Sequence, residues 1–193
     1  MALTESMFPG GSADGSDPWP EHLKSVPIDL TLEEARTGAV VGFKRCFNSY
    51  AKGRTLEPGR SDWGFDRHVR GAQAEIAVAR YLGLTWDPEV VELDNGSGDG
   101  MPGIQVKSVS GKTRRSRFLE VRPWNPIEHV YVLVIVNTFG RFELAGWING
   151  RDARRAGTTR MWDGQHDERN SYIAVPKSAL HPMNELQASI AER

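Results

Sequence analysis

The chain has 193 residues, with 24 Lys and Arg against 25 Asp and Glu, a formal charge of −1. That length suffices for one domain with a substantial core, and the balanced charge neither favours nor excludes a nucleic-acid partner, so only local charge clusters are informative. A single cysteine, Cys46, excludes an internal disulfide and a cysteine-rich zinc site, which fits a reducing cytoplasm. We find no apolar run near the roughly 18 residues of a membrane span and no secretory signal, so we expect a cytoplasmic protein without a membrane partner.

The N-terminal part of the chain predicts a leader followed by a helix. Residues 1–28 are rich in glycine, serine and proline, a composition that favours a flexible leader. Thr31, followed by two acids, supplies the capping hydroxyl and the first-turn negative charge of a helix start. We expect this helix to end near Lys52 and Gly53. Its apolar residues recur at roughly helical spacing: Val40, Val41, Phe43, Phe47 and Tyr50.

Two basic residues, Lys44 and Arg45, lie within this expected helix. Such side chains can contact phosphate groups, but charges on a helix more often form a solvated flank. We therefore predict that both of them face water.

The second predicted helix spans residues 66–82, and Gly83 supplies its stop. Glu75 lies within it, and its neighbours at three- and four-residue spacing are small or apolar. A carboxylate on such a face would be packed against another element, where an unpaired charge is costly and a metal or a lysine would satisfy it. The alternative is a glutamate at the edge of the apolar stripe that reaches water. We favour the functional interpretation, because a turn and strand with further polar groups follow downstream.

An acid, a Gly/Pro turn and a short apolar strand follow one another between residues 98 and 110. Side chains alternate along a strand, so Gln105 and Lys107 point to one face and the residues beside them to the other. The turn folds Asp99 back toward them. A carboxylate, an amide oxygen and an ammonium group then meet at one point, which suits the binding of a divalent metal and the polarisation of a water molecule.

A second acid, Asp94, precedes the same turn, at the end of a strand predicted over residues 89–93. It competes with Asp99 as the metal ligand. Because fewer residues separate Asp99 from the strand that carries Gln105, we prefer Asp99, and Asp94 fits better as a turn-former.

The densest basic cluster in the sequence follows the strand that carries Lys107. Its position suggests that these cations neutralise phosphates and orient a nucleic-acid backbone, although an exposed charged loop without a partner is the alternative. Alternation along the next strand places Phe118, Glu120 and Arg122 on one face. The cluster consists of Lys112, Arg114, Arg115, Arg117 and Arg122.

The second half of the chain is typical of an α/β domain. Residues 129–136 are almost all apolar, which predicts a central strand buried on both faces, and residues 141–148 predict its hairpin partner. We expect a mixed central sheet of about five or six strands, flanked by two N-terminal helices and a short one later. The remaining predicted segments are a basic helix over 152–156, a polar loop over 157–170, an edge strand over 171–176 and a helical or frayed tail over 184–193.

Asp99, followed by Gln105-x-Lys107, resembles the motif of the PD-(D/E)xK nuclease superfamily, in which an Asp precedes a Glu/Asp-x-Lys strand. Gln105 departs from the commonest form of that motif, because it stands where an acid usually stands. Mrr-like restriction endonucleases, a branch of the superfamily, also carry Gln-x-Lys.

The helix around Glu75 extends the resemblance. Residues 71–79 are similar to a helix of phage-type members of this superfamily, in which a Gly-Ala-x-Gly-Glu helix precedes a Gln-Val-Lys or Gln-Val-Arg strand. Ala74 replaces the usual glycine, which exchanges one small residue for another. The combined resemblance is clear over residues 66–110 and weaker beyond them.

The resemblance implies a restriction-endonuclease-like fold, with a single nuclease domain over residues 29–183 between the leader and the tail. It implies metal-dependent hydrolysis of DNA phosphodiester bonds, by an endonuclease of restriction, repair or junction-resolving type, with Mg²⁺ as the cofactor and Mn²⁺ as a substitute. Lys107 would position the attacking water. The implied metal ligands are Glu75, Asp99, the side-chain oxygen of Gln105 and the backbone carbonyl of Val106.

A non-catalytic member of the same fold is the alternative. The loss of one acid at Gln105 is how such a site would begin to decay, leaving a module that binds DNA or a protein. DNA is the expected partner in the first case, and a homodimer is left open.

Overall fold

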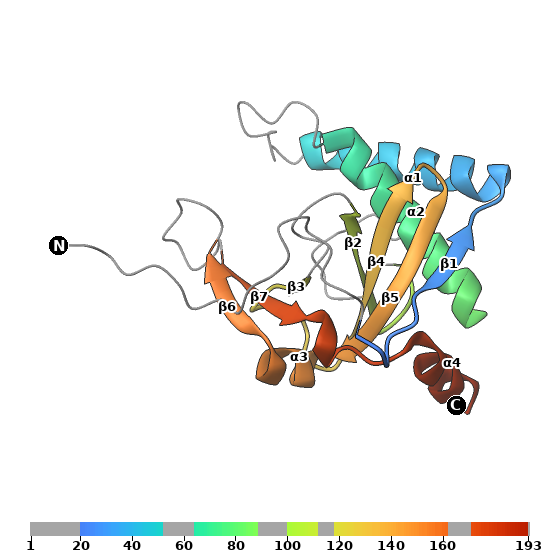
Figure 1. The fold of residues 1–193 in the computed structure, drawn as a ribbon. Helices are drawn as coiled ribbons and strands as arrows, with labels where there is room; N and C mark the ends of the chain where they lie inside the picture. Colours follow the sequence, from blue (N-terminus) through green and yellow to red (C-terminus); the bar gives the residue numbers. More distant parts are fainter. Residues whose placement is uncertain (1–19, 52–63, 89–99, 112–117, 162–170, 193) are drawn as a thin grey trace.

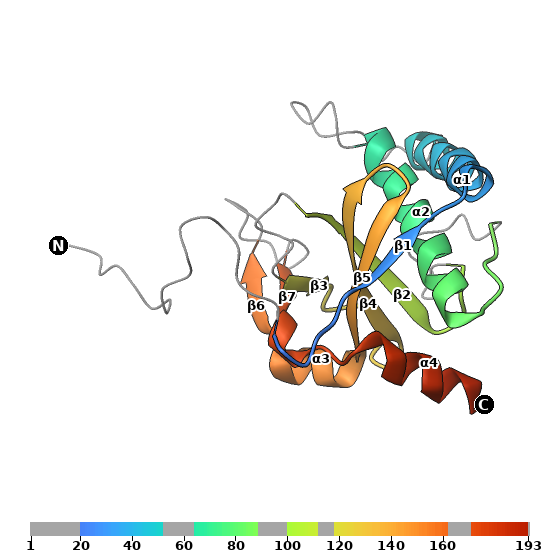
Figure 2. The same ribbon diagram turned by 45° about the vertical axis from the view of Figure 1, so that its right-hand side comes forward.

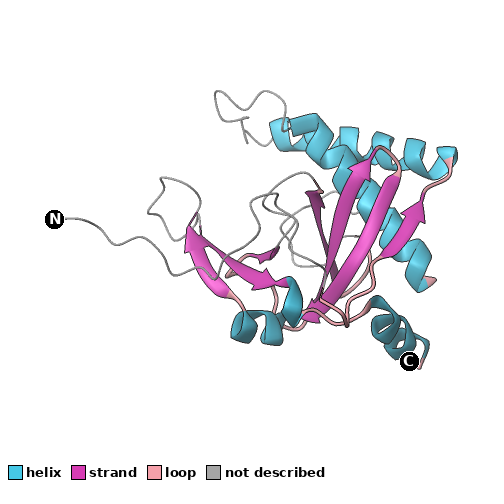
Figure 3. Cartoon of the chain, viewed as in Figure 1, coloured by secondary structure: helices cyan, strands magenta, loops and turns pink. Residues whose placement is uncertain are grey.

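The structure of the chain, a computed structural model, describes residues 20–51, 64–88, 100–111, 118–161 and 171–192 (Figure 1). This part combines four α-helices with two β-sheets, so the predicted α/β class is confirmed (Figure 3). The helices are α1 (Leu32–Ala51), α2 (Gly64–Leu82), α3 (Gly150–Ala156) and α4 (Met183–Ala191), with a 3₁₀ turn at Lys177–Ala179. The strands are β1 (Val26–Asp29), β2 (Ile104–Ser110), β3 (Phe118–Val121), β4 (Val130–Thr138), β5 (Arg141–Asn149), β6 (Thr158–Met161) and β7 (Ser171–Pro176).

The larger sheet has the strand order β1-β5-β4-β2. It is mixed, because β2 runs parallel to β4 while the other neighbouring strands are antiparallel. The predicted central hairpin is confirmed as β4 and β5, and its turn uses Gly140 at a φ of 76°. All side chains from Tyr131 to Val136 are buried, so both faces of β4 are covered.

Two different layers cover the two faces of β4. Small residues of α2, among them Ala77, pack on the face that carries Val132 and Val134. The opposite face carries Tyr131 and Leu133, which pack against apolar side chains of the second sheet. Because β4 is apolar on both faces, a helix layer alone would leave one of them in water.

The second sheet is antiparallel, with the order β3-β7-β6, and lies beside the larger one (Figures 1 and 2). The expectation of one central sheet is therefore wrong, and so is a polar loop over 157–170, since β6 lies within that range. The expectation that residues 171–176 form an edge strand is also wrong, because β7 is the central strand. Pro176 is the last residue of β7, so its missing N–H falls at the end of the ladder, where its loss matters least.

α1 packs on the outer side of α2 rather than on a sheet (Figure 2). Two glycines allow the helices to approach closely. A methyl group added at Gly38 would lie 2.7 Å from Cγ of Gln73, and one at Gly42 would lie 2.5 Å from the backbone of Val69. The contact between the helices is therefore made by small residues of α1.

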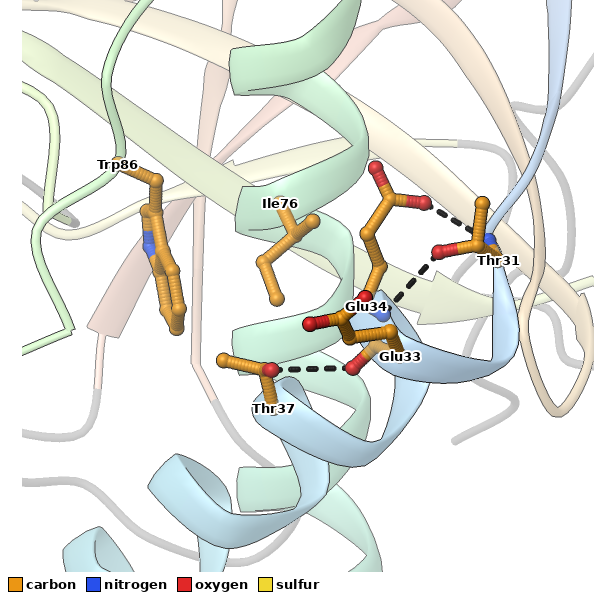
Figure 4. Close-up of a pocket in the computed structure, with 6 residues that line it drawn as sticks. All are labelled: Thr31, Glu33, Glu34, Thr37, Ile76 and Trp86. Atoms are coloured by element: carbon orange, nitrogen blue, oxygen red, sulfur yellow. Dashed lines mark hydrogen bonds between the residues drawn. The ribbon is translucent and has the colours of Figure 1, made fainter.

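The predicted start of α1 and the predicted end of α2 are confirmed, while the expected end of α1 near Lys52 and Gly53 lies outside the described residues. The backbone N–H of Thr31 donates to the carboxylate of Glu34 (2.7 Å), and the N–H of Glu34 donates to the hydroxyl of Thr31 (3.2 Å), which is a capping box (Figure 4). α2 ends before Gly83, which has a φ of 68°. None of the described helices combines the length and the apolar character needed to cross a bilayer.

Two segments outside the expected domain belong to the folded body. β1 begins within the predicted leader and pairs with β5, and Leu23 before it is 3% exposed. Most of α4 lies in the predicted tail, which is helical, and its Leu186 is buried in the main core beside Met183, the last residue of the expected domain. The sequence does not predict the burial of Leu23 and Leu186, because a few apolar residues in a polar segment form no periodic pattern.

Candidate functional site

A tight turn at residues 100–103 leads directly into β2. Gly100 and Gly103 have positive φ angles of 72° and 74°, a conformation that other residues rarely adopt. The turn is held from two sides: the Gly100 carbonyl accepts from the N–H of Asp87 (2.9 Å), and the Gly103 carbonyl accepts from the N–H of Val130 (2.9 Å). The start of β2 is thereby anchored both to β4 and to the segment after α2.

Gln105 and Lys107 share one face of β2, as strand alternation predicts. Lys107 Nζ donates a hydrogen bond to Gln105 Oε1 at 3.3 Å. Their partners across the parallel ladder are Tyr131 and Leu133, which belong to the core between the two sheets. Gln105 is 8% exposed and Lys107 is half-buried. The amide and the ammonium group are thus held together on the sheet face opposite α2, the amide buried and the lysine partly exposed.

Glu75 is buried in α2, with 4% of its surface exposed, as the small residues around it predict. Its partner is an arginine, because Nη1 and Nη2 of Arg45 in α1 donate to Oε1 (2.5 Å) and Oε2 (2.8 Å). The indole N–H of Trp86 also donates to Oε2, at 2.9 Å. The prediction that Arg45 faces water is wrong: its side chain is 3% exposed, and its charge balances that of Glu75. Lys44 beside it is exposed, as expected.

Glu75 and the Gln105–Lys107 pair lie on opposite faces of the larger sheet. α2, which carries Glu75, packs on the face that includes Ile104. Gln105 and Lys107 belong to the other face, together with Val109. The expected common metal site of Glu75 and Gln105 is therefore not formed in this arrangement.

The described part supplies neutral oxygen donors to the predicted metal site. The amide oxygen of Gln105 and the carbonyl of Val106 are donor types that a hard divalent cation accepts. Both carboxylate oxygens of Glu75 accept hydrogen bonds from the guanidinium group of Arg45, whose positive charge balances that of Glu75. Within the described ranges, no three acidic, histidine or cysteine side chains form a group that could hold a metal ion. The predicted anionic ligand, Asp99, and its rival, Asp94, lie outside those ranges.

Arg122 is the member of the predicted basic cluster that the structure describes. Its guanidinium lies over the ring of Trp124, 5.5 Å from the centroid, and donates to the backbone carbonyl of Ser171 (3.4 Å). The other members of the cluster lie outside the described residues: Lys112, Arg114, Arg115 and Arg117.

The outer face of the small sheet carries a second cation on an aromatic ring. Arg160 of β6 lies 4.4 Å from the ring centroid of Phe118. The sheet register places both of them, with Tyr172, on the face away from the inter-sheet core, and the small Ala174 lies between them on the central strand. Sequence reasoning missed Arg160, because the segment was expected to be a loop. Protein surfaces that bind single-stranded nucleic acids typically combine positive charges with aromatic rings.

A hollow of about 420 Å³ lies beside the first turns of α1 (Figure 4). Burial raises the pKa of Glu34, but the hydrogen bonds from Thr31 and the guanidinium of Arg80 outweigh it and hold the pKa below its usual value. The negative charge of this lining is the opposite of what a phosphate ligand needs, so we do not include the hollow in the candidate site. Its lining residues are Thr31, Glu33, Glu34, Thr37, Ile76 and Trp86.

No protein-family model matches this chain, and neither does any curated protein or solved structure. A function for it therefore rests on its own residues and their geometry.

Proposed function

We propose that this chain is a metal-dependent nuclease of the PD-(D/E)xK type, with a restriction-endonuclease-like fold, that hydrolyses DNA phosphodiester bonds. The observation that supports this proposal best is the pair of Lys107 and Gln105, an ammonium group 3.3 Å from an amide oxygen on a strand that follows a glycine turn. A partly desolvated ammonium group interacts more strongly with phosphate oxygens than one in bulk water does. A mixed sheet backed by helices is compatible with this fold.

The proposed roles follow from the donor types on β2 and the turn before it. Asp99, the amide oxygen of Gln105 and the carbonyl of Val106 would hold Mg²⁺, with Mn²⁺ as a substitute. Such an ion, when bound, polarises the scissile phosphate and lowers the pKa of a water ligand. Lys107 would orient the attacking water and stabilise the negative charge that develops on the phosphoryl oxygens.

Glu75 takes a positioning role in this proposal. Its carboxylate accepts a hydrogen bond from the indole N–H of Trp86 at 2.9 Å. Trp86 in turn packs so closely on Gly100 that a methyl group there would lie 2.6 Å from the indole nitrogen. Glu75 therefore helps to fix the turn before β2, and Asp99 is the residue next to that turn.

The DNA backbone would be bound by the basic residues after β2. Arg122 and Arg160 lie on aromatic rings at the small sheet. α3 adds further positive charge, and its Arg154 donates to the backbone carbonyls of Pro123 (2.7 Å) and Asn125 (2.9 Å), which ties the helix to the segment that carries Arg122. These cations would release counterions from the phosphates on binding.

Cleavage assays test the proposal. Supercoiled plasmid, linear duplex and branched DNA are incubated with titrated Mg²⁺ or Mn²⁺ and either the wild-type protein, Lys107→Met, or Lys24→Met as an exposed control. We expect metal-dependent cutting that falls by about 10²-fold or more in Lys107→Met, because a key electrostatic group is lost, and that is unchanged in Lys24→Met. Equal cleavage by Lys107→Met, with circular dichroism confirming that both variants fold, would reject the assignment.

The same assay decides between the two candidate acids. Asp99→Asn is expected to abolish cleavage, and Asp94→Asn to have a mild effect, because a turn-former supplies no charge to the reaction. The reverse order would move the ligand to Asp94.

A non-catalytic nuclease-fold module that binds DNA or a protein is the second candidate. The observation that favours it is that two of the expected metal ligands offer no unbalanced negative charge to a metal ion. Gln105 is neutral, and the charge of Glu75 is balanced by that of Arg45. Binding of DNA without cutting in either metal would support this module over the nuclease.

A further inference from the structure

The two sides of α1 differ in residue size. The buried side of α1, which faces α2, consists of three small residues, one valine and one arginine: Ala35, Gly38, Val41, Gly42 and Arg45. Four other large apolar residues lie on the opposite side of the helix, since they recur at steps of three, four and three residues and are offset from the buried set. We call this outward row the α1 seam, and it consists of Val40, Phe43, Phe47 and Tyr50.

The α1 seam is exposed along its whole length. Its four side chains are 57%, 47%, 58% and 54% exposed, in chain order. Phe43 contacts Phe47, with ring centroids 4.6 Å apart, and Phe65 of α2 at 5.3 Å, and Phe65 is itself 50% exposed. The seam and Phe65 account for five of the nine large apolar side chains that are exposed in the described residues, so the exposed apolar surface is concentrated in one place. Such concentration marks an interaction surface.

The spacing of the seam indicates what would cover it. Residues separated by steps of three, four and three occupy the a and d positions of a heptad. Side chains at these positions pack against the matching row of another helix. Between residues 37 and 51, Lys44 is the only charged side chain of α1 that is exposed, because Arg45 is buried. A helix side facing water normally carries more charge, and interface cores are depleted of it.

We propose that the α1 seam is the interface of a homodimer, in which the seams of two copies pack against each other across a two-fold axis. A seam of this kind is self-complementary, because an antiparallel pairing sets Phe43 of each copy against Phe47 of the other. Aromatic side chains bury roughly 150–250 Å² each, so half-exposed seam residues with Phe65 would cover about 400–500 Å² per copy. The total of about 800–1,000 Å² lies below the roughly 1,200–2,000 Å² of stable interfaces and within the range of weak, transient ones, so we expect a dimer that dissociates readily on dilution.

Sedimentation velocity on the full chain, from about 1 μM to about 100 μM, tests the proposal without DNA or metal. The wild-type protein should shift from monomer to dimer over this range. Phe47→Glu places a charge in the centre of the seam and should leave a monomer at every concentration. Phe139→Glu is the matched control, because Phe139 is 67% exposed but lies in the turn between β4 and β5, and it should still form dimers.

Circular dichroism and thermal unfolding of each variant check that the fold is kept. If Phe47→Glu does not fold, Val40→Lys at the end of the seam takes its place. A wild-type protein that stays monomeric at about 100 μM would overturn the proposal and mean that another part of the chain or another partner covers the seam. A dimer that persists in Phe47→Glu would overturn it as well. Because no DNA is present, neither outcome bears on the proposed nuclease.

Discussion

Arg45 and Glu75, thirty residues apart in the sequence, form a bidentate ion pair buried between α1 and α2, with N···O distances of 2.5 Å and 2.8 Å. The side chains are 3% and 5% exposed. The pair neutralises a carboxylate that the sequence marks as a candidate metal ligand. It also couples the packing of two helices to the position of Trp86 and the turn before β2.

Breaking the ion pair on one side should destabilise the fold strongly. Arg45→Met leaves the charge of Glu75 buried without its partner, and we expect the free energy of unfolding to fall by about 3–5 kcal/mol. The double variant Arg45→Met/Glu75→Leu should recover most of that stability, since no buried charge remains. Urea unfolding of the single and double variants measures both values. A single variant as stable as the wild type would show that the pair contributes little.

Gln105 should decide how much metal the proposed site needs. Gln105→Glu adds a negative charge at nearly constant volume, and a hard cation prefers anionic oxygen, so half-maximal metal binding should occur at a lower Mg²⁺ concentration. Mn²⁺ should bind the wild-type protein more tightly than Mg²⁺ does. The new carboxylate would also pair with Lys107, whose Nζ lies 3.3 Å from Oε1, and so slow cleavage. Calorimetry run beside cleavage assays checks this. If Gln105→Glu and Gln105→Ala both leave the metal dependence unchanged, Gln105 is not a ligand.

Arg122 and Arg160 should contribute to DNA affinity by neutralising phosphates. Replacing both by Gln should reduce the slope of log K against log salt by about 0.9 for each duplex DNA phosphate that the variant no longer neutralises. Arg141→Gln is the control, since Arg141 is 72% exposed but faces Asp29 at the end of the other sheet, and its slope should match the wild type. Fluorescence anisotropy over a salt series gives the slopes. Parallel lines for the double variant and the wild type would place both arginines outside the DNA path.

His68 should make the fold less stable in mild acid. Burial, with the nearby charges of Arg67 and Arg45, holds the pKa of His68 below its ordinary value of 6.5. The unfolded chain then binds this proton more readily than the native one, so stability rises with pH through this range and is lost as pH falls below the unfolded pKa. Urea unfolding at several pH values should show a shallower acid-side decline for His68→Gln than for the wild type. Two curves of the same slope would contradict this assignment.

Gly42 and Gly71 should respond in opposite ways to alanine. A methyl group at Gly42 would lie 2.5 Å from the backbone N and Cα of Val69, and a backbone cannot move aside cheaply, so Gly42→Ala should cost about 1–3 kcal/mol. Nothing lies within 4 Å of the corresponding position at Gly71, so Gly71→Ala should stabilise α2 by about 0.5–1 kcal/mol. Thermal unfolding separates the two. A neutral Gly42→Ala would mean that α1 can slide on α2.

Local patterns in the sequence were sufficient for several elements. The apolar run of β4 predicts a strand covered on both faces, and Gly83 predicts the end of α2 because a glycine there adopts a φ of 68° at little cost. Strand alternation alone predicts that Gln105 and Lys107 share a face. Each of these depends on interactions between residues a few positions apart, which the order of the chain specifies directly.

Tertiary packing decided the rest. The packing of α1 on α2 determines whether Arg45 contacts water or Glu75, and whether Phe43 and Phe47 face inward or outward. The packing of the sheet β3-β7-β6 on β4 determines which face of the larger sheet each candidate ligand joins. Val40, Phe43, Phe47 and Tyr50 recur at helical spacing but are exposed, whereas Gly38 and Gly42 give a close helix contact and bury the opposite side of α1. Each of these outcomes depends on contacts between segments that are distant in the chain. The free-energy difference between two alternative packings of such segments has no local signature in the sequence.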